Sequence, residues 1–145
     1  MYKHFLIPTD GSTLSEVAIY KSIQLAQNLN ARVTGLYVMP EFHVLTYKTE
    51  MLEDTKEQFI KDSRIHAEKY LNVIERIAKE FNVSVNVLAV TNDHPYEAIV
   101  KTAEDRECDL IAMASHGRSG IKAILLGSQT QKVLVHSKMP VLIFR

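Results

Sequence analysis

The sequence LIAMA at residues 110–114 runs directly into SHGRSG at residues 115–120, and Gly127-Ser128 follows seven positions later. An apolar run of this length predicts a strand that is buried on both faces of a parallel sheet. The Ser/Gly/Arg-rich segment predicts a loop beyond the carboxyl end of that strand. Open parallel sheets bind their ligands at this edge. The stretch therefore predicts a fold class and, within it, the position of a binding site.

Two glycines and a serine in this stretch are typical of a phosphate-binding loop. Gly117 and Gly127 would let the backbone approach an anion closely. Ser128 could cap a following helix, whose free N–H groups favour phosphate. Arg118 would either add a positive charge or remain a solvated loop residue. Further donors would come from the first helical turn, from Gln129 and Thr130.

Strand-like and helix-like patterns alternate along the rest of the chain. Strands are expected at residues 2–8, 32–39, 83–90, 110–114 and 141–144, and helices at about 14–29, from about 60 to 81, from 95 onward and at 128–136. A capping box, Thr13 with Glu16, would start the first helix. Residues 41–55 lack a period and predict an exposed connection that could act as a lid. Because parallel strands need long right-handed crossovers, this order predicts a doubly wound α/β sheet with helices on both faces.

Composition limits the class of protein. The chain has 145 residues, of which 46% are apolar, and this predicts one domain over residues 1–145. Lys+Arg and Asp+Glu both number 17, and the absence of a basic stripe argues against nucleic-acid binding. No apolar run reaches the ~18 residues of a membrane span or resembles a signal peptide, so we expect a cytoplasmic protein. The single cysteine, Cys108, excludes an internal disulfide and predicts a partly buried structural thiol.

Common catalytic motifs are missing from the sequence. There is no Gly-x4-Gly-Lys-Ser/Thr loop, no Gly-x-Gly-x-x-Gly after the first strand and no Gly-x-Ser-x-Gly. His116 lies in the motif loop, but without a placed partner it is a poor candidate for a general base. We therefore predict no catalytic residue and no direct metal ligand.

In its motif stretch the chain resembles the universal stress protein family, in the ATP-binding branch. That branch carries Gly, two residues, Gly, nine residues, then Gly followed by Ser or Thr. The pattern falls on Ala114, Gly117 and Gly127-Ser128, so that alanine stands where the family has its first glycine. The resemblance also covers IPTDGS at residues 7–12 and MPVLI at residues 139–143, and thus nearly the whole chain.

The resemblance implies a Rossmann-like domain whose five-stranded parallel sheet has the order 3-2-1-4-5, and a homodimer formed through the last strand. It also implies that ATP binds with Mg²⁺ held through the phosphates. Asp10 would contact ribose or phosphate, or place a hydrated Mg²⁺, whereas the residues alone favour an Asx turn with Gly11. The backbone of Val38 would face adenine. The implied nucleotide-binding set is Pro8, Thr9, Asp10, Val38, Met113, Ala114, Gly117, Arg118, Gly127, Ser128, Gln129 and Thr130, although Val38 and Met113 are equally compatible with ordinary strand and core positions.

These implications predict a nucleotide-dependent stress-response regulator with regulatory protein partners and, at most, slow ATP hydrolysis or autophosphorylation. Fast phosphoryl transfer would need metal clamps and several cations, of which only Arg118 is visible. Two alternatives remain open. One is a dimeric protein-interaction module that has lost nucleotide binding, which Ala114 favours. The other is a pocket that prefers AMP, because the same glycines serve either nucleotide.

Overall fold

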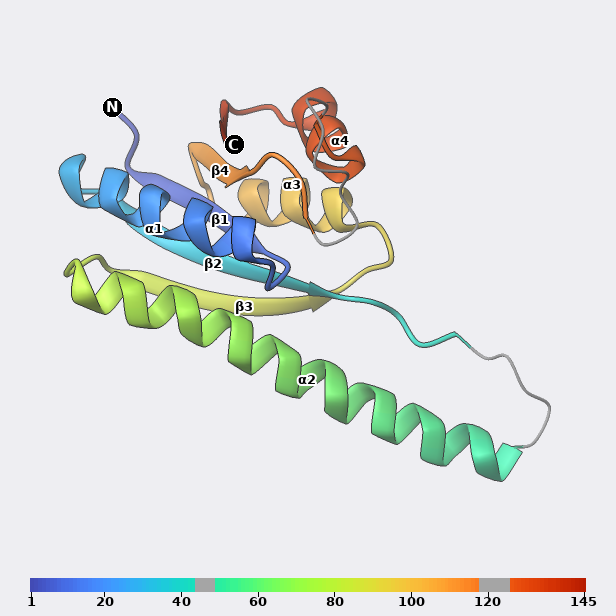
Figure 1. Ribbon diagram of the computed structural model, residues 1–145. Coiled ribbons are helices and arrows are strands. Elements are labelled where there is room, and N and C mark those ends of the chain that lie inside the picture. Colours follow the sequence, from blue (N-terminus) through green and yellow to red (C-terminus); the bar gives the residue numbers. More distant parts are fainter. Residues whose placement is uncertain (44–48, 118–125) are drawn as a thin grey trace.

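The computed structural model describes the backbone of residues 1–43, 49–117 and 126–145, and the side chains of these residues outside 49–54. Within these residues the chain alternates strand and helix, and the parallel sheet has the order β3-β2-β1-β4-β5, as predicted (Figure 1). The strands are β1 (His4–Thr9), β2 (Arg32–Met39), β3 (Val85–Thr91), β4 (Leu110–Ala114) and β5 (Val141–Phe144). The helices are α1 (Thr13–Asn28), α2 (Thr49–Glu80), α3 (Pro95–Asp105) and α4 (Ser128–His136).

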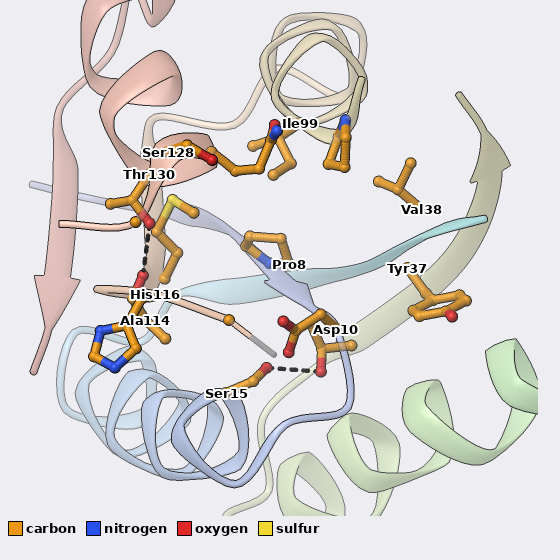
Figure 2. Close-up of a pocket in the computed structure, with 16 residues that line it drawn as sticks. Pro8, Asp10, Ser15, Tyr37, Val38, Ile99, Ala114, His116, Ser128 and Thr130 are labelled. Atoms are coloured by element: carbon orange, nitrogen blue, oxygen red, sulfur yellow. Dashed lines mark hydrogen bonds between the residues drawn. The ribbon is translucent and has the colours of Figure 1, made fainter. Parts of the chain in front are cut away.

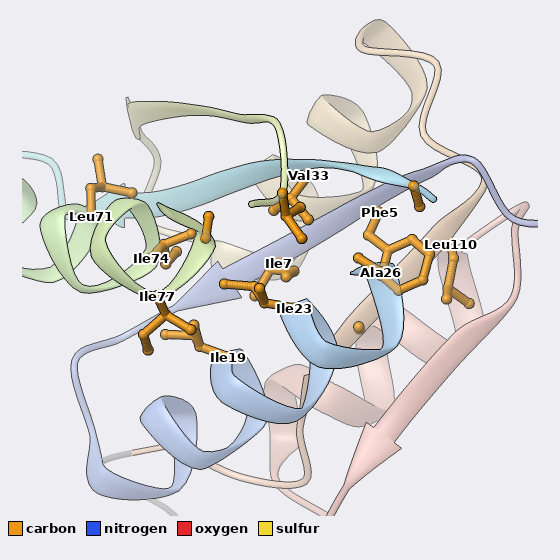
Figure 3. Packing of buried hydrophobic residues seen from close by; sticks show 14 residues of the cluster. Phe5, Ile7, Ile19, Ile23, Ala26, Val33, Leu71, Ile74, Ile77 and Leu110 are labelled. Atoms are coloured by element: carbon orange, nitrogen blue, oxygen red, sulfur yellow. The ribbon is translucent and has the colours of Figure 1, made fainter. Parts of the chain in front are cut away.

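The central strand β1 separates two hydrophobic cores. Successive side chains of a strand point to opposite faces of the sheet. Phe5 and Ile7 therefore pack against α1 and α2, where Ile23 and Ile74 are also fully buried (Figure 3). Leu6 points to the other face, into a cluster to which α3 contributes Ile99 and α4 contributes Val133. Helices thus cover both faces of the sheet, and full burial of each large aliphatic side chain contributes roughly 1.5–3 kcal/mol.

The order of the strands creates a crevice at the carboxyl edge of the sheet. β1 pairs on one side with β2 and on the other with β4: β2 and β3 are added on one side of β1, and β4 and β5 on the other. The helices that follow β1 and β4 in the chain, α1 and α4, lie on opposite faces of the sheet. Such a switch point is where doubly wound folds bind their ligands.

The start of α1 differs from the predicted capping box by one residue. Ser12, with extended backbone angles (φ −72°, ψ 159°), is the N-cap, and its side chain accepts a hydrogen bond from the Ser15 N–H at 3.2 Å. Thr13 is the first helical residue. The Asp10 carboxylate accepts a hydrogen bond from the Ser12 N–H at 2.9 Å, and this turn places the serine, not the adjacent threonine, at the cap.

Helix α2 begins at Thr49, so the predicted irregular connection over residues 41–55 is wrong from residue 49 onward. The N-terminal half of α2 projects beyond the sheet (Figure 1). Because no sheet lies beneath this half, it needs no apolar stripe that faces the sheet, and the hydrophobic periodicity begins only at Ile60. The suggested lid falls partly on residues 44–48, outside the described residues.

Cys108 lies in the core between the sheet and α3 and α4, as a structural thiol. It is buried, and desolvation raises the pKa of its thiol to about 11. The thiol therefore stays protonated at neutral pH. None of the helices in the described part of the chain is both long and apolar enough to cross a membrane.

Candidate functional site

A cavity of about 380 Å³ opens at the carboxyl edge of the sheet (Figure 2). Its wall is formed by the ends of β1, β2 and β4 and by the first turns of α1, α3 and α4. One part of the wall is apolar, and the other carries hydroxyl, carboxylate and backbone groups. The lining residues are Pro8, Thr9, Asp10, Ser15, Tyr37, Val38, Pro95, Ile99, Met113, Ala114, His116, Gly117, Gly127, Ser128, Gln129 and Thr130.

The turn between β1 and α1 is fixed by its own side chains. Thr9 Oγ1 accepts hydrogen bonds from the Gly11 N–H at 3.1 Å and from the Ser15 hydroxyl at 2.8 Å. Asp10 Oδ1 accepts from the Ser12 N–H, so the Asx turn is present. Asp10 also lines the cavity, so the Asx turn leaves this residue at the cavity wall.

Gly117 and Gly127 permit close contacts within the protein itself. A Cβ atom built on Gly117 would overlap Oδ2 of Asp10, which places this carboxylate directly against the glycine. A Cβ atom on Gly127 would lie 3.0 Å from both Cα and Cβ of His116. The Gly127 N–H donates to the carbonyl of Ser115 at 2.8 Å. These two glycines therefore let the ends of the motif loop and the β1–α1 turn pack together.

Helix α4 directs its N-terminus at the cavity. Gly127, in extended conformation (φ −61°, ψ 155°), is the N-cap, so the prediction that Ser128 caps this helix is wrong by one position. The Gln131 N–H donates to the Gly127 carbonyl at 3.0 Å, which is the first i→i−4 hydrogen bond of the helix. The preceding N–H groups, those of Ser128, Gln129 and Thr130, have no intrahelical acceptor. Such groups favour an anion.

Two side chains of α4 hold the wall together. The Tyr96 N–H donates to Oε1 of Gln129 at 3.0 Å, so this glutamine satisfies a free donor at the start of α3. Thr130 is 2% exposed, and its hydroxyl donates to the Ala114 carbonyl at 3.1 Å. The side chains of Gln129 and Thr130 therefore connect α4 to α3 and β4, and their backbone donors remain at the helix end.

Ala114 occupies an ordinary strand conformation. It is the last residue of β4 and lies opposite Phe144 of β5. Among the described residues, the non-glycine residues with positive φ are Asn30, Asn82 and Glu107. Ala114 thus has a negative φ, and its Cβ introduces no backbone strain.

All the residues predicted to contact the nucleotide line this cavity, except Arg118, which lies outside the described residues. Sequence reasoning missed a second group of lining residues. Pro95 and Ile99 belong to the first two turns of α3, which begins at the same edge of the sheet because it follows β3. His116 was considered only as a base, and its Nδ1 lies 3.0 Å from the Ser115 hydroxyl. The full missed set is Ser15, Tyr37, Pro95, Ile99 and His116.

Comparisons of the sequence with known proteins give full-length matches. The model of the universal stress protein family matches residues 1–145. Universal stress protein MJ0577 of Methanocaldococcus jannaschii is 35% identical over 156 residues, which cover 100% of this chain and 96% of that protein. Universal stress protein YxiE of Bacillus subtilis is 34% identical over 149 residues, with 100% of both chains covered.

Comparisons of the structure agree with those of the sequence. The solved structure of MJ0577 superposes with a TM-score of 0.84 at 31% identity, covering 99% of this chain and 95% of that one. A universal stress protein solved in complex with cAMP has a TM-score of 0.73 at 25% identity, covering 99% of this chain and 97% of its own. With the fold, the strand order and the whole length of the sequence in agreement, the chain belongs to the universal stress protein family.

Proposed function

We propose that this protein binds an adenine nucleotide in the cavity at the carboxyl edge of its sheet and acts as a nucleotide-dependent regulator. The observation that carries the proposal is the position of the α4 N-terminus. Its free N–H groups lie at the same cavity that the apolar side chains line. A nucleotide combines an anionic phosphate group with a flat aromatic base, whose faces pack against apolar side chains. A relative of similar fold has been solved with cAMP, and this supports the adenine class.

The composition of the cavity wall supports one orientation of the ligand. The phosphates would lie at Ser128 and the following turn of α4, with Gly117 close by. The base would lie against the apolar part of the wall, near Val38 and Ile99. A volume of about 380 Å³ falls within the range of small-molecule sites. Arg118, outside the described residues, would add positive charge near the phosphates.

Asp10 is the group that fits an accompanying Mg²⁺. Mg²⁺ prefers oxygen ligands and usually retains several waters when it binds with phosphates. The Asp10 carboxylate lines the cavity, and one of its oxygens is already held by the Ser12 N–H. We therefore propose that ATP is the ligand, and that Mg²⁺ binds through its phosphates with Asp10 acting through water.

The charges of the wall favour binding over rapid phosphoryl transfer. In the part of the cavity wall that the structure describes, no lysine or arginine side chain is present. Phosphoryl transfer needs cations to stabilise the moving group. We therefore propose a regulator whose bound state is the signal, with at most slow hydrolysis or autophosphorylation.

Calorimetric titration of the nucleotide-stripped protein with ATP and Mg²⁺ tests the proposal. We expect saturable binding near one nucleotide per chain, at micromolar strength or tighter, which corresponds to about −8 kcal/mol. AMP and cAMP, titrated in parallel, would rank the nucleotides. Failure of all three to bind at millimolar concentration would contradict the proposed function.

A second candidate function is a protein-interaction module without nucleotide, and Ala114 is the observation that favours it. We expect Ala114→Gly to change ATP affinity by less than about threefold, because a residue with negative φ in a strand gains no conformational relief from glycine. Titration of both proteins measures this. A gain of tenfold or more would show that the methyl group obstructs the pocket, and would favour the interaction module.

Pairing with a second copy of the chain is part of either function. β5 is an edge strand of the described sheet, and all of its residues, Val141–Phe144, are only half-buried. An apolar edge strand with unpaired backbone groups tends to pair with another chain. This edge supports the proposal of a homodimer formed through β5.

A further inference from the structure

Two carboxylates and one imidazole lie close together outside the cavity proposed to bind the nucleotide. Glu41 and His43 follow β2, and Asp93 lies in the turn between β3 and α3. Each offers one donor atom, and these atoms all lie within 4.8 Å of one another. The closest pair is Nε2 of His43 and Oδ2 of Asp93, at 2.5 Å. None of the three residues lines the cavity, so the cluster is separate from the proposed nucleotide site.

The backbone holds the two segments of this cluster together. The Asn92 N–H donates to the Met39 carbonyl at 2.9 Å, which extends the contact between β2 and β3 past the end of the strands. The Glu41 N–H donates to Oδ1 of Asp93 at 3.0 Å. Asp93 therefore faces His43 with its second oxygen. Hydrogen bonds thus hold the Asp93 and His43 side chains beside each other, and the Glu41 backbone next to them, before any ligand arrives.

The donor set has the chemistry of a transition-metal site. Clusters of carboxylates alone suit Ca²⁺ or Mg²⁺, whereas an imidazole among the ligands suits zinc and its neighbours in the first row. We propose that Glu41, His43 and Asp93 bind a divalent transition metal of the Zn²⁺ class. The three protein ligands leave further coordination positions to water.

Binding would require only small movements of exposed side chains. Zn–N and Zn–O bonds of about 2.0 Å in tetrahedral geometry place the two ligand atoms roughly 3.3 Å apart. His43 Nε2 and Asp93 Oδ2 would separate by less than 1 Å from their present contact. Glu41 would turn inward. The His43 side chain is 66% exposed and Glu41 is also exposed, so these two rotate against little packing resistance, whereas the Asp93 side chain, 29% exposed, keeps its place. The ion would link the exit of β2 to the turn before α3, whose Pro95 lines the cavity.

Titration of the nucleotide-free full-length protein with Zn²⁺, in a buffer that does not chelate metal, tests the site. We expect one ion per chain and a loss of affinity of at least about tenfold in His43→Ala. The matched control is His66→Ala, which removes another exposed histidine, on α2, and should leave the affinity unchanged. Glu41→Gln, whose backbone donor to Asp93 is retained, should weaken binding as well.

A spectroscopic measurement separates the cluster from weak surface binding. With Co²⁺ as the probe, the wild-type protein should develop visible absorption bands that saturate at one equivalent, and His43→Ala should lose them. Melting temperatures of the metal-free variants establish that each is folded. Absence of saturable binding, or an equal effect of His43→Ala and His66→Ala, would overturn the proposal and leave only a hydrogen bond between His43 and Asp93.

Discussion

Gly117→Ala is expected to lower the affinity for ATP by at least about tenfold, or 1.4 kcal/mol. The added methyl group would overlap Oδ2 of Asp10, and Cγ of the same side chain lies 3.1 Å from the built Cβ. The overlap is relieved only if the Asp10 side chain or the loop that carries Gly117 moves. Each movement displaces a wall of the cavity. Calorimetric titration with ATP and Mg²⁺ measures the loss, and the melting temperature shows whether the variant is folded.

A double variant distinguishes this cause from a direct obstruction of the phosphates. Asp10→Ala removes the carboxylate, so Gly117→Ala should cause a much smaller loss in that background than in the wild type. Contacting residues usually show coupling energies of about 0.5–3 kcal/mol. Equal losses in the two backgrounds would show that the methyl group acts on the ligand instead. Unchanged affinity in the single variant would contradict the placement of Gly117 against Asp10.

The two motif glycines illustrate what the sequence could and could not reveal. Their spacing predicted that both glycines belong to the segment between a strand and a helix, and the expected reason for glycine was the approach of a phosphate. In the structure, Gly117 abuts the Asp10 carboxylate and Gly127 abuts His116. Gly127→Val would therefore weaken binding partly by disturbing the loop itself. A spacing pattern indicates that a side chain is not tolerated, but the neighbour that excludes it is known only from the three-dimensional contacts.

The order of elements was predictable because each strand and most helices bury an apolar side. The start of α2 was not, because the N-terminal half of this helix projects beyond the sheet and the hydrophobic periodicity begins only at Ile60. The start of α1 was misplaced for a different reason. Ser12 and Thr13 are both good caps, and only the hydrogen bond from the Ser12 N–H to Asp10 decides between them.

Part of the candidate site followed from topology and part from packing. Loops after β1 and β4 were expected at the crevice because parallel strands end at one edge. Pro95 and Ile99 reach the same cavity from α3, across the sheet from the turn that holds Ser15. Tyr37 reaches it from β2, beside the expected Val38. Which neighbours of a loop complete its wall depends on helix positions, which hydrophobic periodicity does not determine.

The largest loss of stability is expected from Gly11→Ala, with a free energy of unfolding lower by at least about 2 kcal/mol. Gly11 has a φ of +80°, a conformation that alanine adopts only with strain. Its added Cβ would also overlap the ring of Tyr70, which belongs to α2. For a chain of this length the change corresponds to a fall in melting temperature of roughly 6 °C. Chemical and thermal denaturation measure both quantities.

Comparison with Tyr70→Ala separates the two causes of this loss. Without the tyrosine ring, Gly11→Ala should retain only the backbone strain of about 1–2 kcal/mol. If the loss is the same in both backgrounds, α2 does not press on the β1–α1 turn. A smaller loss without the ring would show that α2 supports the turn that positions Asp10. Because Asp10 lines the cavity, a shift of α2 would then reach the proposed nucleotide site through the glycine–tyrosine contact, and also through the Tyr70 ring, whose centroid lies 5.4 Å from that of the cavity-lining Tyr37.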